Sequence, residues 1–352
     1  MNNDEKVYVA GHKGLVGSAI VRALVARGHD FDKIIVADRN KLDLRNQQIV
    51  YDFFSENTPK YTFLAAAKVG GIGYNMKYPA EFIRDNTMIQ SNVIEAAYKY
   101  NNSGKLLFLG SACIYPKMAP VPIKEEYLMT GPLEESNIGY AMSKIAGHLL
   151  AKKYTEQFNF STISVMPNNL YGINDNFNPE ECHVIPSFIN RFIKAKEEGA
   201  KEVVCFGDGT PTREFLFSDD VADACLFLMD NYYDPDIINI GPNREVSIRE
   251  LSELIARLVG YEGKIVWDTS MPNGTPRRAL DTTRMDNLGW KAKTNLEDGL
   301  KTTIDWYLNN RGNRNARIPL AANEGNDYIS RSISISNILT DYETIHSGTT
   351  GC

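Results

Sequence analysis

Three glycines near the start of the chain constrain its fold more than any other feature. Gly11, Gly14 and Gly17 follow an apolar run, Lys6–Ala10, and open a segment with helical periodicity. A glycine loop between a strand and a helix lets an anion approach the backbone, and the helix N-terminus offers that anion free N–H groups and a partial positive charge. The arrangement therefore predicts a dinucleotide-binding unit rather than an ordinary tight turn.

The first half of the chain continues this alternation of short apolar runs and amphipathic segments. Further strands are predicted at Ile34–Ala37, Thr62–Ala66, Leu106–Leu109 and Thr162–Met166, and the clearest helices at Asn86–Tyr100 and Tyr140–Phe158. Strands that alternate with helices indicate an α/β protein with a Rossmann-type, doubly wound parallel sheet.

Beyond about residue 171 the loops lengthen, and proline and glycine cluster within them. Glu214–Met229 and Ile237–Ile240 are expected to return to the main sheet. The predicted division is a dinucleotide-binding domain at 1–172 with a returning segment at about 212–245, a smaller discontinuous substrate-binding domain at 173–211 and 246–310, and a C-terminal surface tail at 311–352.

Composition and charge exclude several classes of function. The chain has 352 residues and a net charge of −6, which argues against a nucleic-acid surface. No apolar run is long enough to span a bilayer, and the N-terminus lacks the pattern of a signal peptide. The five cysteines are scattered without a CxxC pair, which favours free thiols in the cytoplasm and no metal site.

The choice of dinucleotide depends on residues around the second predicted strand. Asp38 ends that strand, where an acid normally binds the ribose 2′-hydroxyl and favours NAD. Lys13 in the glycine loop and Arg39 directly after the acid could instead hold a 2′-phosphate. We favour NADP, with NAD as the alternative. Asp43 could hold the adenine amino group or be a solvated loop acid.

Tyr140 and Lys144 stand four residues apart on a predicted helix and therefore share one face. Ser111 follows the strand predicted at Leu106–Leu109. A ketone that accepts a hydride must also accept a proton, and a tyrosine can supply it when a neighbouring ammonium lowers its pKa. These residues predict hydride transfer at a carbonyl that Ser111 helps to polarise.

The sequence resembles the GDP-L-fucose synthases, a branch of the extended short-chain dehydrogenase/reductases. The resemblance covers residues 6 to about 310 and is carried by VAGHKGLVGSAI, LAAAKVGGI, LGSACIYPK, YAMSKIAG, SVMPNNLYG, HVIPSFINRF, FGDGTPTREFLFSDDVA and NGTPRRALDTTR, in this order. It implies an NADPH-dependent enzyme of the Ser111, Tyr140 and Lys144 type, and it implies that Ala65 contacts the cofactor.

The resemblance also implies epimerisation of the substrate before its reduction. In this family GDP-4-keto-6-deoxy-D-mannose is inverted at C3 and C5 by a cysteine and a histidine, which the motifs match to Cys113 and His183. A thiolate is a competent base and an imidazole can return a proton. Tyr115 is expected to pack or to line the pocket.

For the GDP end of the substrate, the resemblance points to Arg213, with Arg191 and Arg278 as further candidates. The planar guanidinium can bond two phosphate oxygens at once. Asn169 is expected to line the sugar pocket and Phe206 to form an apolar wall near the nucleotide.

Two other functions are consistent with the same motifs. One is a reductase without epimerase activity, acting on a related GDP-4-keto-hexose or GDP-4-keto-heptose. The other is a protein that senses a dinucleotide without turnover, which has no need of Tyr140 and Lys144. By analogy with the family we also expect a homodimer paired through the helices at Asn86–Tyr100 and Tyr140–Phe158.

Overall fold

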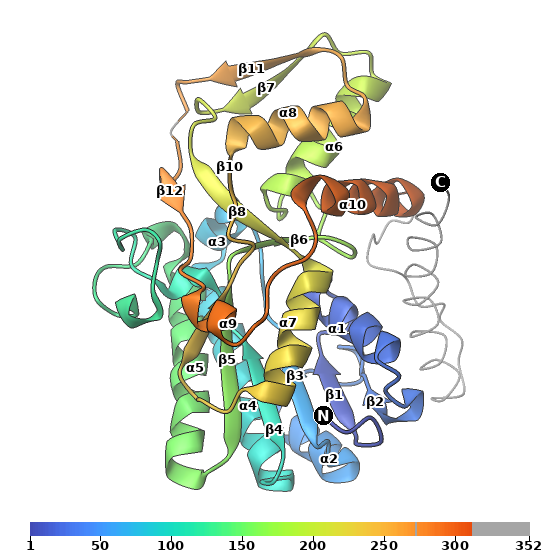
Figure 1. Ribbon diagram of the computed structural model, residues 1–352, viewed down its shortest axis with the longest axis vertical. Helices are drawn as coiled ribbons and strands as arrows, with labels where there is room; N and C mark the ends of the chain where they lie inside the picture. The colour runs from blue at the N-terminus through green and yellow to red at the C-terminus, as the bar shows by residue number, and fades with distance from the viewer. Residues whose placement is uncertain (272, 312–352) are drawn as a thin grey trace.

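The structure is a computed structural model that describes residues 1–271 and 273–311 (Figure 1). Except for Arg311, the tail expected at 311–352 lies outside the described residues. Six parallel strands form the main sheet in the order β2-β1-β3-β4-β5-β9. These strands are β1 (Val7–Ala10), β2 (Ile34–Ile35), β3 (Tyr61–Leu64), β4 (Lys105–Leu109), β5 (Ser161–Pro167) and β9 (Ile237–Ile240).

The strands of this sheet are mostly apolar and almost entirely buried, as expected for a parallel sheet that is covered on both faces. The strand order reverses between β1 and β3. At such a reversal the connections after the two strands leave in opposite directions, and ligands bind beyond the carboxyl ends of the strands. The predicted α/β fold is confirmed, and β2 is two residues shorter than the predicted Ile34–Ala37.

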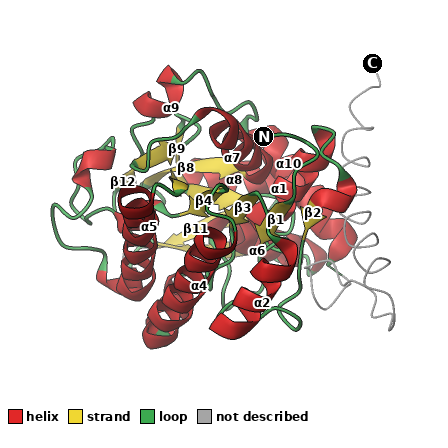
Figure 2. Ribbon diagram, turned by 90° about the horizontal axis from the view of Figure 1, so that it is seen from below, coloured by secondary structure: helices red, strands yellow, loops and turns green. Residues whose placement is uncertain are grey.

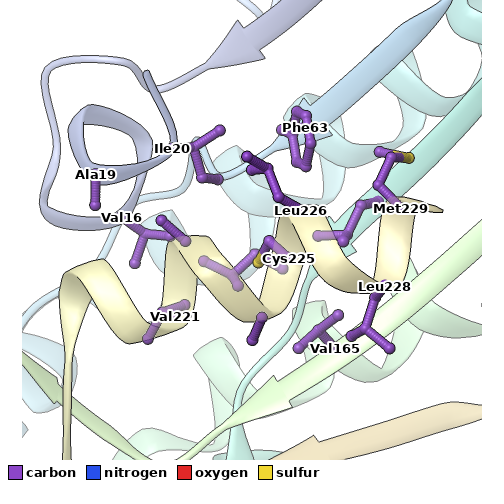
Figure 3. Packing of buried hydrophobic residues seen from close by; sticks show 14 of the residues in the cluster. Val16, Ala19, Ile20, Phe63, Val165, Val221, Cys225, Leu226, Leu228 and Met229 are labelled. Atoms are coloured by element: carbon purple, nitrogen blue, oxygen red, sulfur yellow. The ribbon is translucent and has the colours of Figure 1, made fainter. Parts of the chain in front are cut away.

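Helices lie on both faces of the main sheet (Figure 2). One face carries α1 (Leu15–Ala26) and α7 (Ser218–Asn231), and the other carries α2 (Gln47–Asn57), α4 (Pro79–Tyr100) and α5 (Ile138–Phe158). Figure 3 shows how Val221, Cys225 and Leu226 of α7 pack with Ile20 of α1 and with Val165 of the sheet. This packing buries the apolar faces that the sequence pattern predicts.

A second group of strands and helices lies beyond the carboxyl ends of the main sheet (Figure 1). Its four-stranded sheet contains β6 (Asn169–Tyr171), β8 (Thr212–Phe217), β10 (Glu245–Ser247) and β12 (Arg277–Arg278), and β7 (Glu202–Phe206) pairs with β11 (Lys264–Asp268). The helices here are α6 (Val184–Glu197), α8 (Ile248–Val259) and α10 (Leu296–Asn310). They share an apolar core drawn from residues between 171 and 307.

Local signals explain where α8 begins and ends. The Ser247 side chain accepts a hydrogen bond from the backbone N–H of Glu250, and the Glu250 carboxylate accepts one from the N–H of Ser247. This reciprocal capping box satisfies donors that a helix start leaves free. Gly260 follows the helix with a φ of 72°, a left-handed conformation that glycine adopts without strain.

The expectation that Glu214–Met229 returns to the main sheet is correct for α7 and wrong for β8. The position beside β5 is occupied by β9, which joins the main sheet as expected. β8 instead pairs with β6, β10 and β12. An apolar run such as Phe215–Phe217 indicates a buried strand but does not indicate which sheet buries it.

Two short helices, α3 (Ile72–Lys77) and α9 (Thr283–Asn287), complete the described elements that matter for the site. Within residues 1–271 and 273–311, no helix is both long and apolar enough to cross a membrane.

Candidate active site

The turn after β1 has room for glycine only. Gly11 has a φ of +86°, and a Cβ on it would lie 2.9 Å from the backbone of Ala66. A Cβ on Gly17 would lie 2.1 Å from the carbonyl oxygen of Gly11. Gly14 is the N-cap of α1 and no side chain caps this helix, so its first N–H groups can bind an anion. This loop fits the pyrophosphate of a dinucleotide.

Ala65 lies beside this loop. Its backbone N–H donates to the carbonyl oxygen of Ala10, at a distance of 3.1 Å, where β3 ends next to β1. Ala65 is half-buried and follows the strand at which the sheet order reverses. The predicted cofactor residue is therefore at the edge where a dinucleotide would lie.

The carboxylate of Asp38 has two partners in the glycine loop. Its carboxylate lies 2.6 Å from Nζ of Lys13 and 3.3 Å from Nε2 of His12. The hydrogen bond from His12, and then that from Lys13, hold the pKa of Asp38 well below its usual range. Arg39 is exposed beside it. Asp38, whose place in the sequence favours NAD, is thus already paired with a cation. His12 is a partner that the sequence did not predict.

Asp43 is not a freely solvated loop acid. Its carboxylate binds the guanidinium of Arg45, with 2.6 Å between Oδ2 and Nη2, and Arg45 also lies 3.4 Å from Asp85. The hydrogen bonds from Arg45 lower the pKa of Asp43 to about 2. A carboxylate has about four acceptor positions, so this pairing leaves capacity for a further donor such as an amino group.

Ser111, Tyr140 and Lys144 come together at the carboxyl end of β4. The Ser111 side chain is hydrogen-bonded to Tyr140. Nζ of Lys144 lies 5.8 Å from the centre of the Tyr140 ring and donates to the carbonyl oxygen of Leu109, 2.7 Å away. α5 can lie close to β4 because Gly147 faces Phe108, where a Cβ would approach the ring to 2.6 Å.

The titration of this group differs from the sequence expectation. Burial raises the pKa of Tyr140, and the hydrogen bond with Ser111 only partly opposes it. Burial also lowers the pKa of Lys144 to about 7. The expected lowering of the tyrosine pKa by an adjacent ammonium is therefore absent. A raised pKa keeps the proton on Tyr140 at neutral pH, which suits a group that donates a proton.

Cys113 lies next to the same tyrosine and lysine. A thiolate at Cys113 would raise the pKa of both Tyr140 and Lys144, and the backbone N–H of Cys113 donates to Oγ of Ser111 at 3.3 Å. Nδ2 of Asn137 donates to Sγ of Cys113 at 3.4 Å. Cys113 is half-buried, so a ligand can reach the thiol.

His183 has no direct bond to this region, and the segment before it is linked to the region through α3. It precedes α6, and solvent reaches its side chain. Surrounding protein atoms nevertheless lower its pKa, which favours the neutral imidazole. The N–H of Gly71, before α3, donates to Glu181 at 2.7 Å, and α3 packs on the turn that contains Asn137. No hydrogen bond joins His183 to Cys113 among the described residues.

Two arginines lie side by side on the second sheet. Arg278 of β12 pairs in parallel register with Arg213 of β8, so their side chains leave the same face. Burial, and then the charge of Arg278, lower the pKa of Arg213. Nη2 of Arg278 also donates to the carbonyl oxygen of Ala112 at 2.6 Å, beside Cys113. No carboxylate lies within salt-bridge distance of either guanidinium in the described part of the chain.

Comparison with known proteins agrees with this geometry. The family model of the NAD-dependent epimerase/dehydratase family matches residues 7–241. GDP-L-fucose synthase 1 of Arabidopsis thaliana is 53% identical over 309 residues, which cover 88% of this chain and 95% of that one. The chain belongs to the NAD-dependent epimerase/dehydratase family, in its GDP-L-fucose synthase branch.

Two further members of the family bear on its range of functions. GDP-L-fucose synthase of Escherichia coli (strain K12) is 46% identical over 316 residues, which cover 87% of this chain and 98% of that one. The solved GDP-mannoheptose C4 reductase of Campylobacter jejuni, with NADP bound, superposes with a TM-score of 0.80 at 36% identity, covering 88% of this chain and 99% of that one.

The remaining predicted substrate residues of this family member lie on or near the second sheet. Arg191 of α6 donates to the carbonyl oxygen of Val204, and its guanidinium lies 5.9 Å from the ring of Phe206. Phe206 is 62% exposed, so it can form a wall only when a ligand or another segment covers it. Nδ2 of Asn169 donates to the carbonyl oxygen of Glu214 at 3.0 Å, which anchors β6 to β8.

Several polar residues that hold the site together carry no clear signal in the sequence. Glu214 accepts from Nδ2 of Asn168 at 2.7 Å and from the N–H of Leu280 at 2.9 Å, which ties three segments together. Tyr115 is buried, as expected, and donates to Asn239 at 2.6 Å. The only signal for Asn168 was its place in the PNNLYG run. Among the described residues, no cluster of three or more His, Cys, Asp or Glu could hold a metal ion.

Proposed function

We propose that this chain is an NADPH-dependent epimerase and reductase that converts GDP-4-keto-6-deoxy-D-mannose to GDP-L-fucose. The observation that carries the proposal is the position of Cys113, which faces the same Tyr140 and Lys144 that serve reduction. One carbonyl held by Ser111 and Tyr140 then lies within reach of a proton donor and of a base. The names of relatives about half identical to this chain support the same substrate.

In the reduction step the cofactor supplies a hydride to C4 of the keto sugar. Ser111 and Tyr140 hydrogen-bond the carbonyl oxygen, and Tyr140 gives its proton to that oxygen as negative charge develops there. Lys144 holds Tyr140 in place and, when charged, stabilises the phenolate that remains. Lys144 is buried and Ser111 and Tyr140 are half-buried, so a bound substrate can reach the hydroxyls and displace water from around the reacting carbonyl.

In the epimerisation steps the 4-keto group acidifies the neighbouring C–H bonds. The Cys113 thiolate takes the proton from carbon, an S–H bond forms, and the electron pair of the C–H bond passes into an enolate whose oxygen bonds Ser111 and Tyr140. His183 in its protonated form returns a proton to the opposite face of that carbon. Before the second carbon is inverted, the Cys113 thiol gives its proton to solvent and the neutral His183 imidazole takes one up, so both residues serve C3 and C5 in turn.

The nucleotide end is assigned to Arg213 and Arg278, with Arg191 and Phe206 near the base and Asn169 at the sugar. Two adjacent guanidinium groups without a carboxylate partner suit a diphosphate. For the cofactor we assign Gly11, Gly14 and Gly17 to the pyrophosphate and Lys13 and Arg39 to the 2′-phosphate of NADP. Asp43 is assigned to the adenine and Ala65 to the wall beside it.

Incubation with GDP-4-keto-6-deoxy-D-mannose and either NADPH or NADH, with the product identified by NMR, tests this function. We expect GDP-L-fucose with NADPH. A parallel incubation in heavy water without cofactor should place deuterium at C3 and C5. Cys113→Ser should abolish this exchange, and a wild-type protein that exchanges nothing would overturn the epimerase part.

The second candidate is a 4-reductase that does not epimerise and acts on a related GDP-4-keto-hexose or GDP-4-keto-heptose. It is favoured by the likeness to a GDP-mannoheptose C4 reductase along 88% of this chain. Reduction of the substrate without deuterium at C3 or C5 is the result that this candidate requires.

Three further assignments accompany the proposal. The domains are a dinucleotide-binding part at 1–172, which α7 and β9 rejoin, and a substrate-binding part at 173–211 and 246–310, whose sheet also holds β8. The protein acts in the cytoplasm, where its thiols stay reduced.

The protein forms a homodimer through α4 and α5, which expose Ile83, Met88 and Met142 by more than 40% each. Light scattering of the wild type and of Met142→Asp tests this, because a charge at the interface should leave a monomer.

A further inference from the structure

Asn137 occupies a position where asparagine normally caps a helix, but its side chain does not cap. It is the last residue of the 3-10 turn η4 (Glu135–Asn137) and the N-cap of α5, three residues before Tyr140. An asparagine there usually accepts a hydrogen bond from the second or third N–H of the helix, which stabilises it by about 1 kcal/mol. No such bond is present. By contrast, Asn46 caps α2 in this way, with the N–H of Ile49 as donor.

The side chain of Asn137 is directed to the base of the proposed epimerisation instead. Its Nδ2 donates to Sγ of Cys113 at 3.4 Å. Its Oδ1 is buried and has no hydrogen-bond partner in the protein. Buried amide oxygens are nearly always paired, so an unpaired one beside a reactive thiol points to an acceptor for a ligand hydroxyl.

We propose that Asn137 is a positioning residue that bridges Cys113 and the substrate. Its N–H group holds and stabilises the thiolate, and its Oδ1 accepts a hydrogen bond from a hydroxyl of the keto sugar next to the carbon that loses its proton. A hydrogen bond to the charged form of an acid favours that form. The proton itself passes from carbon to sulfur, and Asn137 keeps both of its own. This inference rests on the proposed function.

Other charged groups around Cys113 act together with this bond. Tyr140 and Lys144 face it from α5, and Arg278 of β12 binds the carbonyl oxygen of the preceding residue. None of these donates a hydrogen bond to the sulfur. Asn137 is therefore the donor whose removal alters the thiolate most directly while leaving the tyrosine and lysine in place.

The test measures Cys113 alkylation by iodoacetamide as a function of pH, read by mass spectrometry of the peptide that contains it. We expect Asn137→Ala to move the midpoint of alkylation upward by about one pH unit, the loss of one hydrogen bond to a charged group. Asn137→Asp has nearly the same size but cannot donate and adds a negative charge, so its midpoint should move further. Deuterium exchange at C3 and C5 should fall about tenfold to a hundredfold in both variants.

Two controls separate this role from a structural one. Because Asn137 does not cap α5, Asn137→Ala should melt at the wild-type temperature, whereas Asn46→Ala should lower the melting temperature by about 1 to 2 °C and leave exchange unchanged. An alkylation profile identical to that of the wild type in Asn137→Ala would overturn the inference. If wild-type protein exchanges no deuterium, the proposed function fails, while the alkylation profile still decides whether Asn137 stabilises the thiolate.

Discussion

The two halves of the candidate site hold their charged groups in different ways. At the end of the main sheet each group has a partner in the protein: Ser111 bonds Tyr140, and Lys144 bonds the carbonyl oxygen of Leu109. On the second sheet Arg213 and Arg278 bond the carbonyl oxygens of Thr212 and Ala112, and their like charges lie next to each other without a carboxylate partner among the described residues. The protein thus holds the side chains at both ends, but it leaves the two like charges of the nucleotide end without a counter-charge until an anion joins them.

The difference follows from how the two regions are built. Ser111, Tyr140 and Lys144 come from one strand end and one helix, which pack over the core of a parallel sheet. Arg213 and Arg278 come from strands that are more than 60 residues apart in the chain and that meet only at short edges. A ligand that bridges such strands adds stability to the folded state by mass action.

The largest effect is expected at the reacting end. Tyr140→Phe removes the proton donor and keeps the ring that packs against Phe82. NADPH consumption should fall about a thousandfold, within the range for loss of a general acid. Absorbance at the nicotinamide band measures this, and cofactor fluorescence should show nearly normal binding. A variant that keeps more than a third of wild-type turnover would remove the tyrosine from the mechanism.

The burial of Lys144 at the reacting end should lower the stability of the folded protein. Burial lowers the pKa of Lys144 to about 7, below the ordinary lysine value of about 10.4. Between these pH values the unfolded chain binds a proton that the folded protein does not, so stability rises with pH across this window. Below about pH 7 both states hold the proton, and the folded protein then carries the full cost of a buried ammonium.

Lys144→Met should therefore be more stable than the wild type by on the order of 3 kcal/mol at about pH 6. This advantage should shrink as the pH rises from about 7 to 10. Urea unfolding at several pH values measures it, and Lys153→Met, on the exposed face of the same helix, should show no such trend. A stability difference between the variant and the wild type that does not change with pH would mean that the pKa of Lys144 is not lowered in the folded protein.

At the nucleotide end, removal of a cation should weaken substrate binding and have little effect on the stability of the free protein. Arg213→Ala removes one of two like charges, so the free protein should lose little stability, while the KM for the GDP-sugar should rise about a hundredfold. Melting curves with GDP test the same point, because GDP should stabilise the wild type and not the variant. Arg244→Ala, a change at an exposed arginine, is the control. Equal losses in kcat and in affinity would place Arg213 at the reacting carbonyl instead.

This contrast also explains what the sequence could predict. The strands and helices of the main sheet were predictable because each apolar run and each amphipathic helix carries its own local signal, as in Val7–Ala10 and α4. The place of β8 was not, because its three partner strands, β6, β10 and β12, come from distant segments of the chain. Tyr140 and Lys144 share one helix face and could be paired by spacing. The roles of His12 and Asn137 could not, since each depends on a contact across the fold.

The smallest effect is expected where the adenosine of the cofactor would bind. This part of the site resembles the reacting end in one respect and the nucleotide end in another. Lys13 is paired with Asp38, as groups are at the reacting end, yet it is also a cation that a phosphate could bind. Lys13→Ala should raise the KM for NADPH about tenfold, the worth of one exposed charge-assisted bond, and leave that for NADH nearly unchanged. Asp38→Asn should lower the KM for NADPH and raise that for NADH, because it frees Lys13 for the 2′-phosphate and removes an acceptor for the ribose hydroxyl. Steady-state kinetics with both cofactors measures the ratio. If Lys13→Ala weakens NADPH and NADH equally, then Lys13 only holds the glycine loop through Asp38, and the discrimination between the two cofactors must lie with Arg39.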